Sequence, residues 1–524
     1  MLRVEGLSLD IHGAPILRDV CFGVAPGEVF GLVGESGSGK SMTALAAMGL
    51  LPRGAEVSGS VLFGDTELLG LAERTMCDLR GREIGMIFQE PMTALNPVQT
   101  IGDQVAETLV VHGVASRGEA RDGVAARLAR VGLEGVSPGR YPHELSGGQR
   151  QRVCIAMAVA LRPKLLIADE PTTALDVTTQ AQILALLKDL VVDEGMALML
   201  ITHDLAVVAD RADHVAVMRA GRVVEADATE ALFRAGAHPY TRKLLEDSAH
   251  VPARAVAVAD VPVLEVEGVV RDYPLKRVNF LGPRPVFRAV DGVSLVVRQG
   301  ESVGLVGESG CGKSTLTRAI LGLDMVQGGT IRLDGDTVDG RHLEAALRAK
   351  MQVVFQDPYG SFNPRHKVGR LVAEPFHLMS LGAGEQRVRV AEALQAVGLQ
   401  PSDQEKFIHE FSGGQRQRIA IARAIVIRPR LVVLDEAVSA LDVTIRAQIL
   451  DLLADLQGRF GLSYLFISHD LSVVRAITDR VLVMQAGRIV EQGETAQVFQ
   501  APEHAYTRAL IAATPQIPED WVAA

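Results

Sequence analysis

The sequence predicts two α/β domains of one architecture, and three observations support this fold class. The same ordered set of short motifs occurs twice in the 524 residues. In each copy, short apolar runs alternate with amphipathic stretches, which predicts a mainly parallel sheet covered by helices. Each copy is roughly 250 residues long, a comfortable size for one packed core.

The repeat is defined by the spacing of its motifs. The copies are offset by 273 residues at Lys40 and Lys313, by 267 at Gln89 and Gln356, and by 266 at every later motif. One loop-length difference near residues 50–80 therefore accounts for most of the change in offset between the two copies. Regular duplication of this kind indicates two domains, each with its own set of motifs.

We expect the two domains at residues 1–248 and 263–524, joined by a linker at 249–262. The linker contains small residues and two prolines and carries little charge. Each domain opens with short strands and turns, which predict an antiparallel β part. The segments 88–145 and 355–411 are helix-rich and predict a helical subdomain in each copy.

Three buried strands are expected in each domain, because short apolar runs of this kind are typical of parallel strands. An amphipathic helix separates the second strand from the third and ends at a Gly, a common helix terminus. The strand segments are Val29–Gly34, Lys164–Glu170, Ala197–Asp204, Ser302–Gly307, Arg430–Glu436 and Tyr464–Asp470.

The composition narrows the class of protein. The net charge of −10 argues against nucleic acid as the main partner, because proteins that bind it carry a basic face. Cys21, Cys77, Cys154 and Cys311 have no metal-like or disulfide-like spacing, which fits a reducing compartment. The N-terminus lacks a basic-then-apolar run, and no stretch reaches about 18 apolar residues, so we expect neither a signal peptide nor a membrane span.

Both Gly-rich loops have the context of a phosphate-binding P-loop, because each follows a strand and opens a helix. Glycines let backbone N–H groups wrap a phosphate, and the helix N-terminus adds positive potential. The lysines are expected to contact the β- and γ-phosphates, and Ser41 and Ser314 to bind Mg²⁺. The candidate binding residues are Gly34, Glu35, Ser36, Gly37, Ser38, Gly39, Lys40, Ser41 and Met42, and Gly307, Glu308, Ser309, Gly310, Cys311, Gly312, Lys313, Ser314 and Thr315.

Two acidic residues end the second strand of each domain. Asp169 and Asp435 are placed to hold Mg²⁺ through water, since an acid there lies near the P-loop. Glu170 and Glu436 are placed to polarise an attacking water as general bases. A solvated acidic pair is the structural alternative, and the preceding P-loop favours the catalytic interpretation.

The motif SGGQRQR opens a helix in both domains. Ser-x-x-Gln is also a helix capping box, which gives the motif a purely structural interpretation. A Gly-rich helix start with free N–H groups binds anions, and capping requires neither the paired glycines nor QRQR. The candidate phosphate contacts are Ser146, Gly147, Gly148 and Gln149, and Ser412, Gly413, Gly414 and Gln415.

A histidine and a glutamine complete each set. His203 and His469 end the third strands and suggest a γ-phosphate contact, although a lone histidine is more often structural. Gln89 and Gln356 lie in Pro-rich loops and are candidates for binding Mg²⁺ or the attacking water. An ordinary Pro turn is the alternative for the glutamines.

Together these residues resemble the ATP-binding-cassette (ABC) ATPases over nearly the whole chain. The Walker A, Q-loop, signature, Walker B, D-loop and H-loop motifs occur in order, twice, with D-loops at 174–176 and 440–442. GLVGESGSGKS, FQEPMTALNP, LSGGQRQR, HPYTRKLL and HAYTRALI look like the oligopeptide/dipeptide/nickel importer branch. The resemblance implies two tandem P-loop NTPase domains that bind ATP and Mg²⁺ and hydrolyse ATP.

The resemblance also implies an assembly. Such importers usually have two separate ATPase subunits, and this chain looks like both fused. ATP on Lys40 would be capped by Ser412, and ATP on Lys313 by Ser146, with both sites competent. The implied partners are two membrane-spanning permease subunits, which would contact the loops after Gln89 and Gln356, and an extracytoplasmic solute-binding protein. The chain would then be peripheral, on the cytoplasmic face of the cell membrane.

The chain departs from the family pattern in two respects, and one cysteine lies inside a P-loop. Tyr273 occupies the place of the aromatic residue that stacks on adenine, whereas Ile11, beside His12, occupies it in the first domain. Neither tail contains the cysteines that bind iron–sulfur in some members, so no such cluster is expected. Cys311 lies inside the second P-loop. The favoured interpretation is a small residue that fills a tight turn, and the alternative is a thiol that reagents can modify when ATP is not bound.

Three functions compete. An importer's ATPase is favoured over a soluble tandem ABC protein acting on ribosomes, because the linker is short and nearly uncharged and the net charge is acidic. A DNA-repair or chromosome ATPase is disfavoured because CxxC pairs and sustained heptads are missing.

Export is the alternative to import if the protein is a transporter ATPase. Dipeptide, oligopeptide, peptide antibiotic, glutathione, opine and nickel all remain open as cargo, because no residue here would touch the solute.

Overall fold

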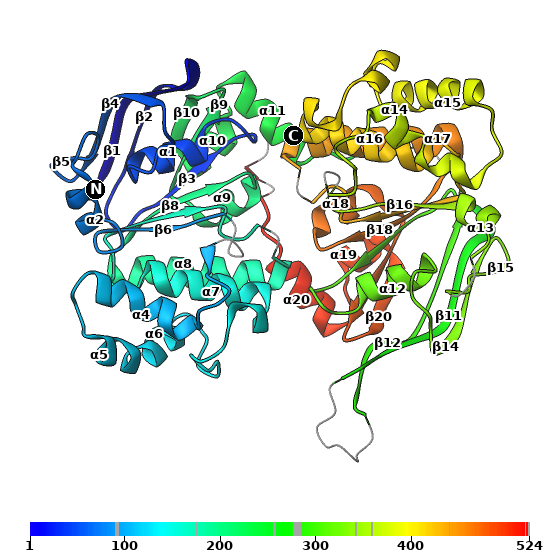
Figure 1. Ribbon diagram of the computed structural model, residues 1–524, viewed down its shortest axis with the longest axis horizontal. Helices are drawn as coiled ribbons and strands as arrows, with labels where there is room; N and C mark the ends of the chain where they lie inside the picture. The colour runs from blue at the N-terminus through cyan, green and yellow to red at the C-terminus, as the bar shows by residue number, and fades with distance from the viewer. Residues whose placement is uncertain are drawn as a thin grey trace. The chain divides into compact units, whose positions relative to one another are not determined.

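Contacts divide the chain into two units in the computed structural model (Figure 1). Unit 1 comprises Met1–Leu175, Thr179–Ala249 and Pro515–Ala524, and unit 2 comprises Asp176–Thr178 and His250–Thr514. The residues that the structure describes are 1–89, 94–173, 175–254, 258–275, 284–340, 343–357, 360–439, 441–518 and 520–521.

Unit 1 contains two sheets, as the sequence predicts. Their strands are β1 (Leu2–Ile11), β2 (Ala14–Val24), β3 (Val29–Val33), β4 (Ala55–Phe63), β5 (Thr66–Glu67), β6 (Ile84–Ile87), β7 (Leu165–Asp169), β8 (Ala197–Thr202), β9 (His214–Arg219) and β10 (Arg222–Ala228). The antiparallel sheet has the order β2-β1-β4-β5. The larger sheet has the order β10-β9-β3-β8-β7-β6 and is parallel except at β10.

Unit 2 repeats both sheets. Its strands are β11 (Ala259–Pro274), β12 (Val286–Gln299), β13 (Ser302–Val306), β14 (Gly328–Leu333), β15 (Asp336–Thr337), β16 (Met351–Val354), β17 (Leu431–Asp435), β18 (Ser463–Ser468), β19 (Arg480–Gln485) and β20 (Arg488–Glu494). The orders are β12-β11-β14-β15 and β16-β17-β18-β13-β19-β20, and β20 is again the antiparallel edge. The predicted fold class is confirmed in both units.

Helices cover one face of each larger sheet, and the antiparallel sheet packs on the other face together with the helix that follows the Gly-rich loop. Unit 1 has α1 (Lys40–Ala47), α2 (Glu73–Leu79), α4 (Ile101–Val111), α5 (Arg117–Asp122), α6 (Val124–Arg130), α7 (Gly147–Ala158), α8 (Val177–Glu194), α9 (Leu205–Arg211), α10 (Thr229–Ala235) and α11 (Pro239–Ser248). Unit 2 has α12 (Lys313–Ile320), α13 (Ala345–Lys350), α14 (Val368–Val372), α15 (Ala383–Ala396), α16 (Gly413–Ile425), α17 (Val443–Phe460), α18 (Leu471–Ile477), α19 (Thr495–Gln500) and α20 (Ala505–Ala513). Within the described residues, no helix combines the length and apolar character needed to cross a bilayer.

The cores explain why these strands are almost wholly apolar. Successive side chains of a strand point to opposite faces, so a sheet covered on both sides needs apolar residues throughout. In β7, Leu165 and Ile167 pack toward the antiparallel sheet and α1, whereas Leu166 and Ala168 pack toward α4, α7 and α8. Figure 1 shows α4–α8 gathered on one side of the larger sheet of unit 1.

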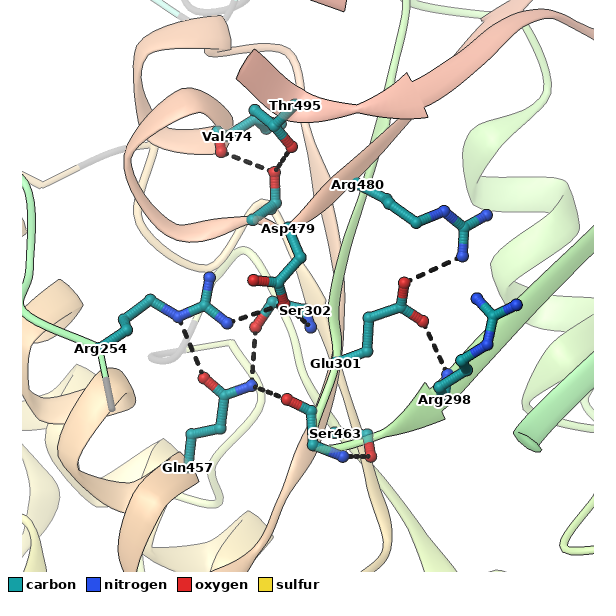
Figure 2. A network of polar contacts seen from close by, with 12 residues as sticks. Arg254, Arg298, Glu301, Ser302, Gln457, Ser463, Val474, Asp479, Arg480 and Thr495 are labelled. Carbon is teal, nitrogen blue, oxygen red and sulfur yellow. Dashed lines mark hydrogen bonds and ion pairs between the residues drawn. The ribbon is translucent and has the colours of Figure 1, made fainter. Parts of the chain in front are cut away.

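The chain enters unit 2 through a partly buried arginine. Arg254 donates from Nη2 to Asp479 Oδ2 (2.8 Å) and from Nε to Gln457 Oε1 (3.3 Å) (Figure 2). Gln457 is fully buried and donates in turn to Gly300 O and Ser302 Oγ. Arg254 is therefore bonded to residues of unit 2 ahead of the first strand of that unit.

The C-terminal segment contacts unit 1. Trp521 lies 6.0 Å from Phe233 of α10, measured between ring centroids. Arg234 donates to the backbone carbonyl of Asp520 (2.6 Å) and forms an ion pair with its carboxylate. Ile517 and Trp521 join the apolar cluster formed by α9, α10 and α11.

Candidate nucleotide-binding and hydrolysis sites

Each P-loop folds around the ammonium group of its lysine. Lys40 is the first residue of α1 and is buried, and its Nζ donates to Gly34 O (2.6 Å) and Glu35 O (2.9 Å). Lys313, the first residue of α12, makes the same two contacts at the same distances. Both loops thus place a positive charge beside the N-terminus of a helix, as phosphate binding requires.

The first glycine of each loop is required by a close backbone approach. Gly34 and Gly307 both have φ of 151°. A Cβ atom would lie 2.3 Å from Met218 O at the first position and 2.2 Å from Met484 O at the second. Only glycine therefore allows the loop to turn against the neighbouring strand, β9 or β19.

The aspartate that ends β7 lies beside the P-loop. A hydrogen bond joins its side chain to Ser41, and burial raises the pKa of Asp169. Asp169 Oδ1 is buried and has no hydrogen-bond partner within the described residues. Burial also raises the pKa of Asp435, and the neighbouring Glu436 carboxylate adds to the effect. A buried, incompletely paired carboxylate next to a serine hydroxyl has the oxygen donors that Mg²⁺ prefers.

The glutamates that follow these strands have an unusual backbone. Glu170 has φ of 47° and Glu436 has φ of 51°, in the left-handed region that non-glycine residues rarely adopt. Strained backbone of this kind clusters at functional sites. Its recurrence at the same position in both units marks both glutamates as candidates for a catalytic role.

Three side chains hold the Glu170 carboxylate. His203 Nδ1 lies 3.3 Å from Oε1, while Gln89 Nε2 and Thr173 Oγ1 each donate to Oε2 at 2.9 Å. Burial alone would raise the pKa of Glu170, but the hydrogen bond and charge of His203, with the Thr173 hydroxyl, lower it to about 2. The carboxylate is therefore ionised at neutral pH, as a general base must be.

The Glu436 carboxylate has fewer partners. His469 Nδ1 lies 3.3 Å from Glu436 Oε1, repeating the first site. Its pKa is lowered because this hydrogen bond and charge, with Lys313, outweigh the effect of burial. Ser439 donates to the Glu436 backbone carbonyl instead of the carboxylate (2.9 Å). Gln356 makes no hydrogen bond to Glu436 in the part of the chain that the structure describes. Fewer of the predicted site residues therefore contact one another in the second site than in the first.

The signature motifs form capping boxes in both units. Ser146 Oγ accepts from the Gln149 N–H (3.3 Å), and Gln149 Oε1 accepts from the Ser146 N–H (3.1 Å). Ser412 and Gln415 repeat both contacts. The serine and glutamine therefore have a structural role whether or not they also contact phosphate.

Packing explains part of the pattern of the motif, namely its second glycine and its arginines, which capping does not require. A Cβ at Gly148 would lie 2.4 Å from Thr179 Cγ2, and one at Gly414 would lie 2.7 Å from Ile445 Cγ2, so the second glycine lets α7 approach α8 and α16 approach α17. The first glycine of each pair has room for a side chain. In QRQR the arginines donate to backbone carbonyls of neighbouring loops; Arg152, for example, donates to Val131 O (2.6 Å).

Tyr273 is engaged within its own unit. Its hydroxyl donates to Asp324 Oδ2 (3.0 Å), and the Arg271 guanidinium lies 4.5 Å from its ring centroid. One face of the ring is therefore covered by an arginine. The predicted D-loop residues Ala174 and Ala440, and the loops at 90–93 and 358–359, lie outside the described residues.

Two tyrosines beside the P-loops were not identified as site residues from the sequence. The Glu35 N–H donates to Tyr240 Oη (3.4 Å), and the Glu308 N–H donates to Tyr506 Oη (3.0 Å). Both tyrosines belong to the HPYT and HAYT segments, which carry the resemblance to the importer branch. The recurrence of those segments after each copy was the signal that could have pointed to them.

Family models match both copies. The model described as "ABC transporter" matches residues 17–173 and 290–439. The model described as "Oligopeptide/dipeptide transporter, C-terminal region" matches residues 224–255 and 490–523, which include the two tyrosine segments.

Curated relatives are similar over almost the whole chain, and each alignment covers 98% of it. The peptidoglycan transport ATP-binding protein YejF of Agrobacterium fabrum is 48% identical, with 96% of the relative covered. The glutathione import ATP-binding protein GsiA of Salmonella typhimurium is 45% identical, with 89% covered. The oligopeptide transport ATP-binding protein OppD of Mycobacterium tuberculosis is 45% identical, with 98% covered.

Proposed function

This chain belongs to the ABC transporter family and is an ATP-binding, ATP-hydrolysing protein, and we propose that it energises an importer of peptides or a related small solute. The observation that carries the proposal is the combination, found twice, of an ABC cassette with the C-terminal region of oligopeptide/dipeptide transporters. The relatives named for peptidoglycan transport, glutathione import and oligopeptide transport support a peptide-like cargo. The proposed domains are 1–248 and 263–524, with 249–262 between them.

The P-loops are proposed to bind the phosphates of ATP. Lys40 and Lys313 would neutralise the β- and γ-phosphates, because their buried ammonium groups already lie within the loop backbone. The N-termini of α1 and α12 would add hydrogen-bond donors and positive potential. The signature serines, Ser146 and Ser412, are kept as proposed phosphate contacts, and Tyr273 as a proposed adenine contact.

The same sites fit Mg²⁺. Ser41 with Asp169, and Ser314 with Asp435, would hold the ion, with Gln89 or Gln356 as a further oxygen donor. The unpartnered Oδ1 of Asp169 and the burial of both aspartates support this assignment, because a nearby cation would stabilise their ionised form. When bound, Mg²⁺ neutralises charge on the phosphates.

Glu170 and Glu436 are proposed as general bases. The water oxygen would bond to the γ-phosphorus while its proton passes to the glutamate carboxylate. The bond from that phosphorus to the β–γ bridging oxygen breaks, and its electrons leave with ADP. His203 and His469 would orient the carboxylates, since each lies 3.3 Å from its glutamate.

A groove in unit 2 supports a membrane partner. It has a volume of 740 Å³, and its lining includes Phe355, Gln356 and Leu323. Leu323 and Phe355 are 59% and 41% exposed, so the groove presents two large apolar side chains to solvent. We assign the groove to a short helix of a membrane-spanning permease subunit, with one such subunit for each domain and a solute-binding protein on the far side of the membrane. The chain would then bind peripherally at the cytoplasmic face.

An affinity purification tests the importer proposal. The tagged protein is purified from detergent-solubilised native cells, and co-purifying chains are identified by mass spectrometry. Two polytopic membrane proteins, with a solute-binding protein captured or encoded beside them, are expected. Recovery of ribosomal proteins, or of no membrane protein, would overturn the importer proposal and leave the ATPase activity unaffected.

A further inference from the structure

A tyrosine hydroxyl touches the backbone of each P-loop. Tyr506 Oη accepts from the Glu308 N–H at 3.0 Å, and Tyr240 Oη accepts from the Glu35 N–H at 3.4 Å. The two members of each pair are 198 and 205 residues apart in the sequence. The contact recurs at the same loop position in both units, which argues against chance.

The residue that the tyrosine holds is also held by the P-loop lysine. In unit 2 the Glu308 N–H is bound by Tyr506, and the Glu308 carbonyl accepts from Lys313 Nζ at 2.9 Å. In unit 1 the Glu35 carbonyl accepts from Lys40 at the same distance. Hydrogen bonds therefore link the tyrosine, the glutamate backbone and the lysine in series, and the series ends at the ammonium group proposed to bind phosphate.

The helix that carries each tyrosine is anchored independently of the P-loop. His504 caps α20 by accepting from the Tyr506 N–H at Nδ1 (3.2 Å). Glu491 of β20 accepts from the N–H groups of Glu503 (2.7 Å) and His504 (3.0 Å). The start of α20 is thus bonded to the sheet edge, which fixes the position of Tyr506, the second residue of the helix.

Unit 1 uses the same anchor. His238 Nδ1 accepts from the Tyr240 N–H at 3.1 Å, and Glu225 of β10 accepts from the N–H groups of Ala237 (2.9 Å) and His238 (3.1 Å). Both tyrosines are buried in apolar clusters with strands β9 or β19. Packing therefore holds each ring against its strand, with the hydroxyl oxygen as the acceptor that faces the P-loop.

We propose that Tyr240 and Tyr506 are positioning residues that hold the two P-loops in their nucleotide-binding shape. The proposal rests on the assignment of those loops as the ATP sites, and it gives a role to the C-terminal region of the family. A neutral hydrogen bond contributes about 1 kcal/mol, so its loss corresponds to about fivefold weaker nucleotide binding. The second site should respond more strongly, because its hydrogen bond is the shorter.

The test measures nucleotide affinity one site at a time in the full chain. Lys40→Ala disables the first site and leaves the second intact, so Tyr506→Phe is introduced into the Lys40→Ala protein. Lys313→Ala disables the second site, so Tyr240→Phe is introduced into the Lys313→Ala protein. Trinitrophenyl-ATP is titrated by fluorescence at equilibrium. Kd is expected to rise about fivefold with Tyr506→Phe, and by less with Tyr240→Phe.

The matched control is Tyr464→Phe in the Lys40→Ala chain. Tyr464 is also buried in unit 2, and its hydroxyl donates to Leu453 O (2.9 Å) rather than to a P-loop. This variant loses one buried hydrogen bond but should keep the Kd of its parent. Hydrogen exchange of the peptide containing residues 307–312 should accelerate with Tyr506→Phe and not with Tyr464→Phe.

The outcomes separate two failures. If the chain with both Lys40→Ala and Lys313→Ala binds trinitrophenyl-ATP as well as wild type, the assignment of the P-loops is wrong. If that chain loses binding, but Tyr506→Phe changes Kd by less than about twofold and leaves exchange unaltered, only the positioning role is overturned.

Discussion

At the scale of single residues, the two candidate bases are held to different extents. Gln89, Thr173 and His203 all contact the Glu170 carboxylate, whereas His469 is the one such contact of Glu436 among the described residues. Both glutamates nevertheless share the left-handed backbone and the lowered pKa. The features common to both sites are the ones on which the proposed chemistry depends.

The cysteines should differ sharply in reactivity. Burial raises the pKa of Cys154 to about 12 and also raises that of Cys311, so neither forms much reactive thiolate near pH 7. Cys21 and Cys77 are exposed. Maleimide labelling at pH 7, read by peptide mass spectrometry, should modify Cys21 and Cys77 first.

Labelling in urea is the control for the cysteines, because all four should then react. Labelling of Cys311 as fast as Cys77 in the folded protein would contradict the buried assignment. It would favour the reagent-accessible alternative. The burial of Cys311 supports the favoured sequence interpretation of a small residue that fills a tight turn.

Local sequence predicts the residues whose role is local. The P-loop, the acidic strand ends and the SGGQ helix starts each occupy one short segment, and their order identifies them. Tyr240 and Tyr506 could not be placed in the same way, because their hydrogen bonds join segments about two hundred residues apart, and only folding reveals which backbone N–H a buried hydroxyl meets.

At the scale of elements, the signature helix is shaped by two separate demands. Its capping box satisfies N–H groups that every helix start leaves open. Its second glycine allows α7 to approach α8, and α16 to approach α17. The local sequence predicts the cap but not the packing role of Gly148, because Thr179 lies on another helix about thirty residues further along the chain.

A substitution of that glycine should destabilise unit 1. Gly148→Ala places a Cβ 2.4 Å from Thr179 Cγ2, and overpacking of this kind costs about 1–3 kcal/mol. Gly147→Ala is the matched control, since its Cβ would lie at an ordinary 3.6 Å from Leu175. Thermal unfolding should show a lower Tm for Gly148→Ala than for Gly147→Ala. Equal Tm values would contradict the packing role.

At the scale of the whole molecule, the duplication gives each unit the same two sheets. The predicted strand segments and the antiparallel β part all occur, because their apolar patterns are continuous in sequence. The C-terminal segment is different. Its contacts with α10 depend on Arg234 and Phe233, which lie almost 290 residues away, so no local pattern announces them.

Trp521 reports on that segment, because it is the only tryptophan of the chain. Its packing near Phe233 predicts shielding from acrylamide quenching. Arg234→Ala removes the contacts with Asp520 and should increase quenching and shift the emission to longer wavelength. Lys243→Ala, an exposed change on α11, should alter neither.

A fully solvent-exposed Trp521 would contradict the packing of the C-terminal segment. If wild-type emission is quenched as readily as that of free N-acetyltryptophanamide, Trp521 does not pack against unit 1. Arg234→Ala would then have no effect on the emission.

The central claim is that both cassettes hydrolyse ATP through a glutamate base. The direct measurement is phosphate release by the purified chain carrying Glu170→Gln and Glu436→Gln together, with trinitrophenyl-ATP binding measured alongside. Binding should be retained, and turnover should fall by at least about 10²-fold, since general bases contribute about 10²–10⁴-fold. Hydrolysis at the wild-type rate by this double variant would contradict the account.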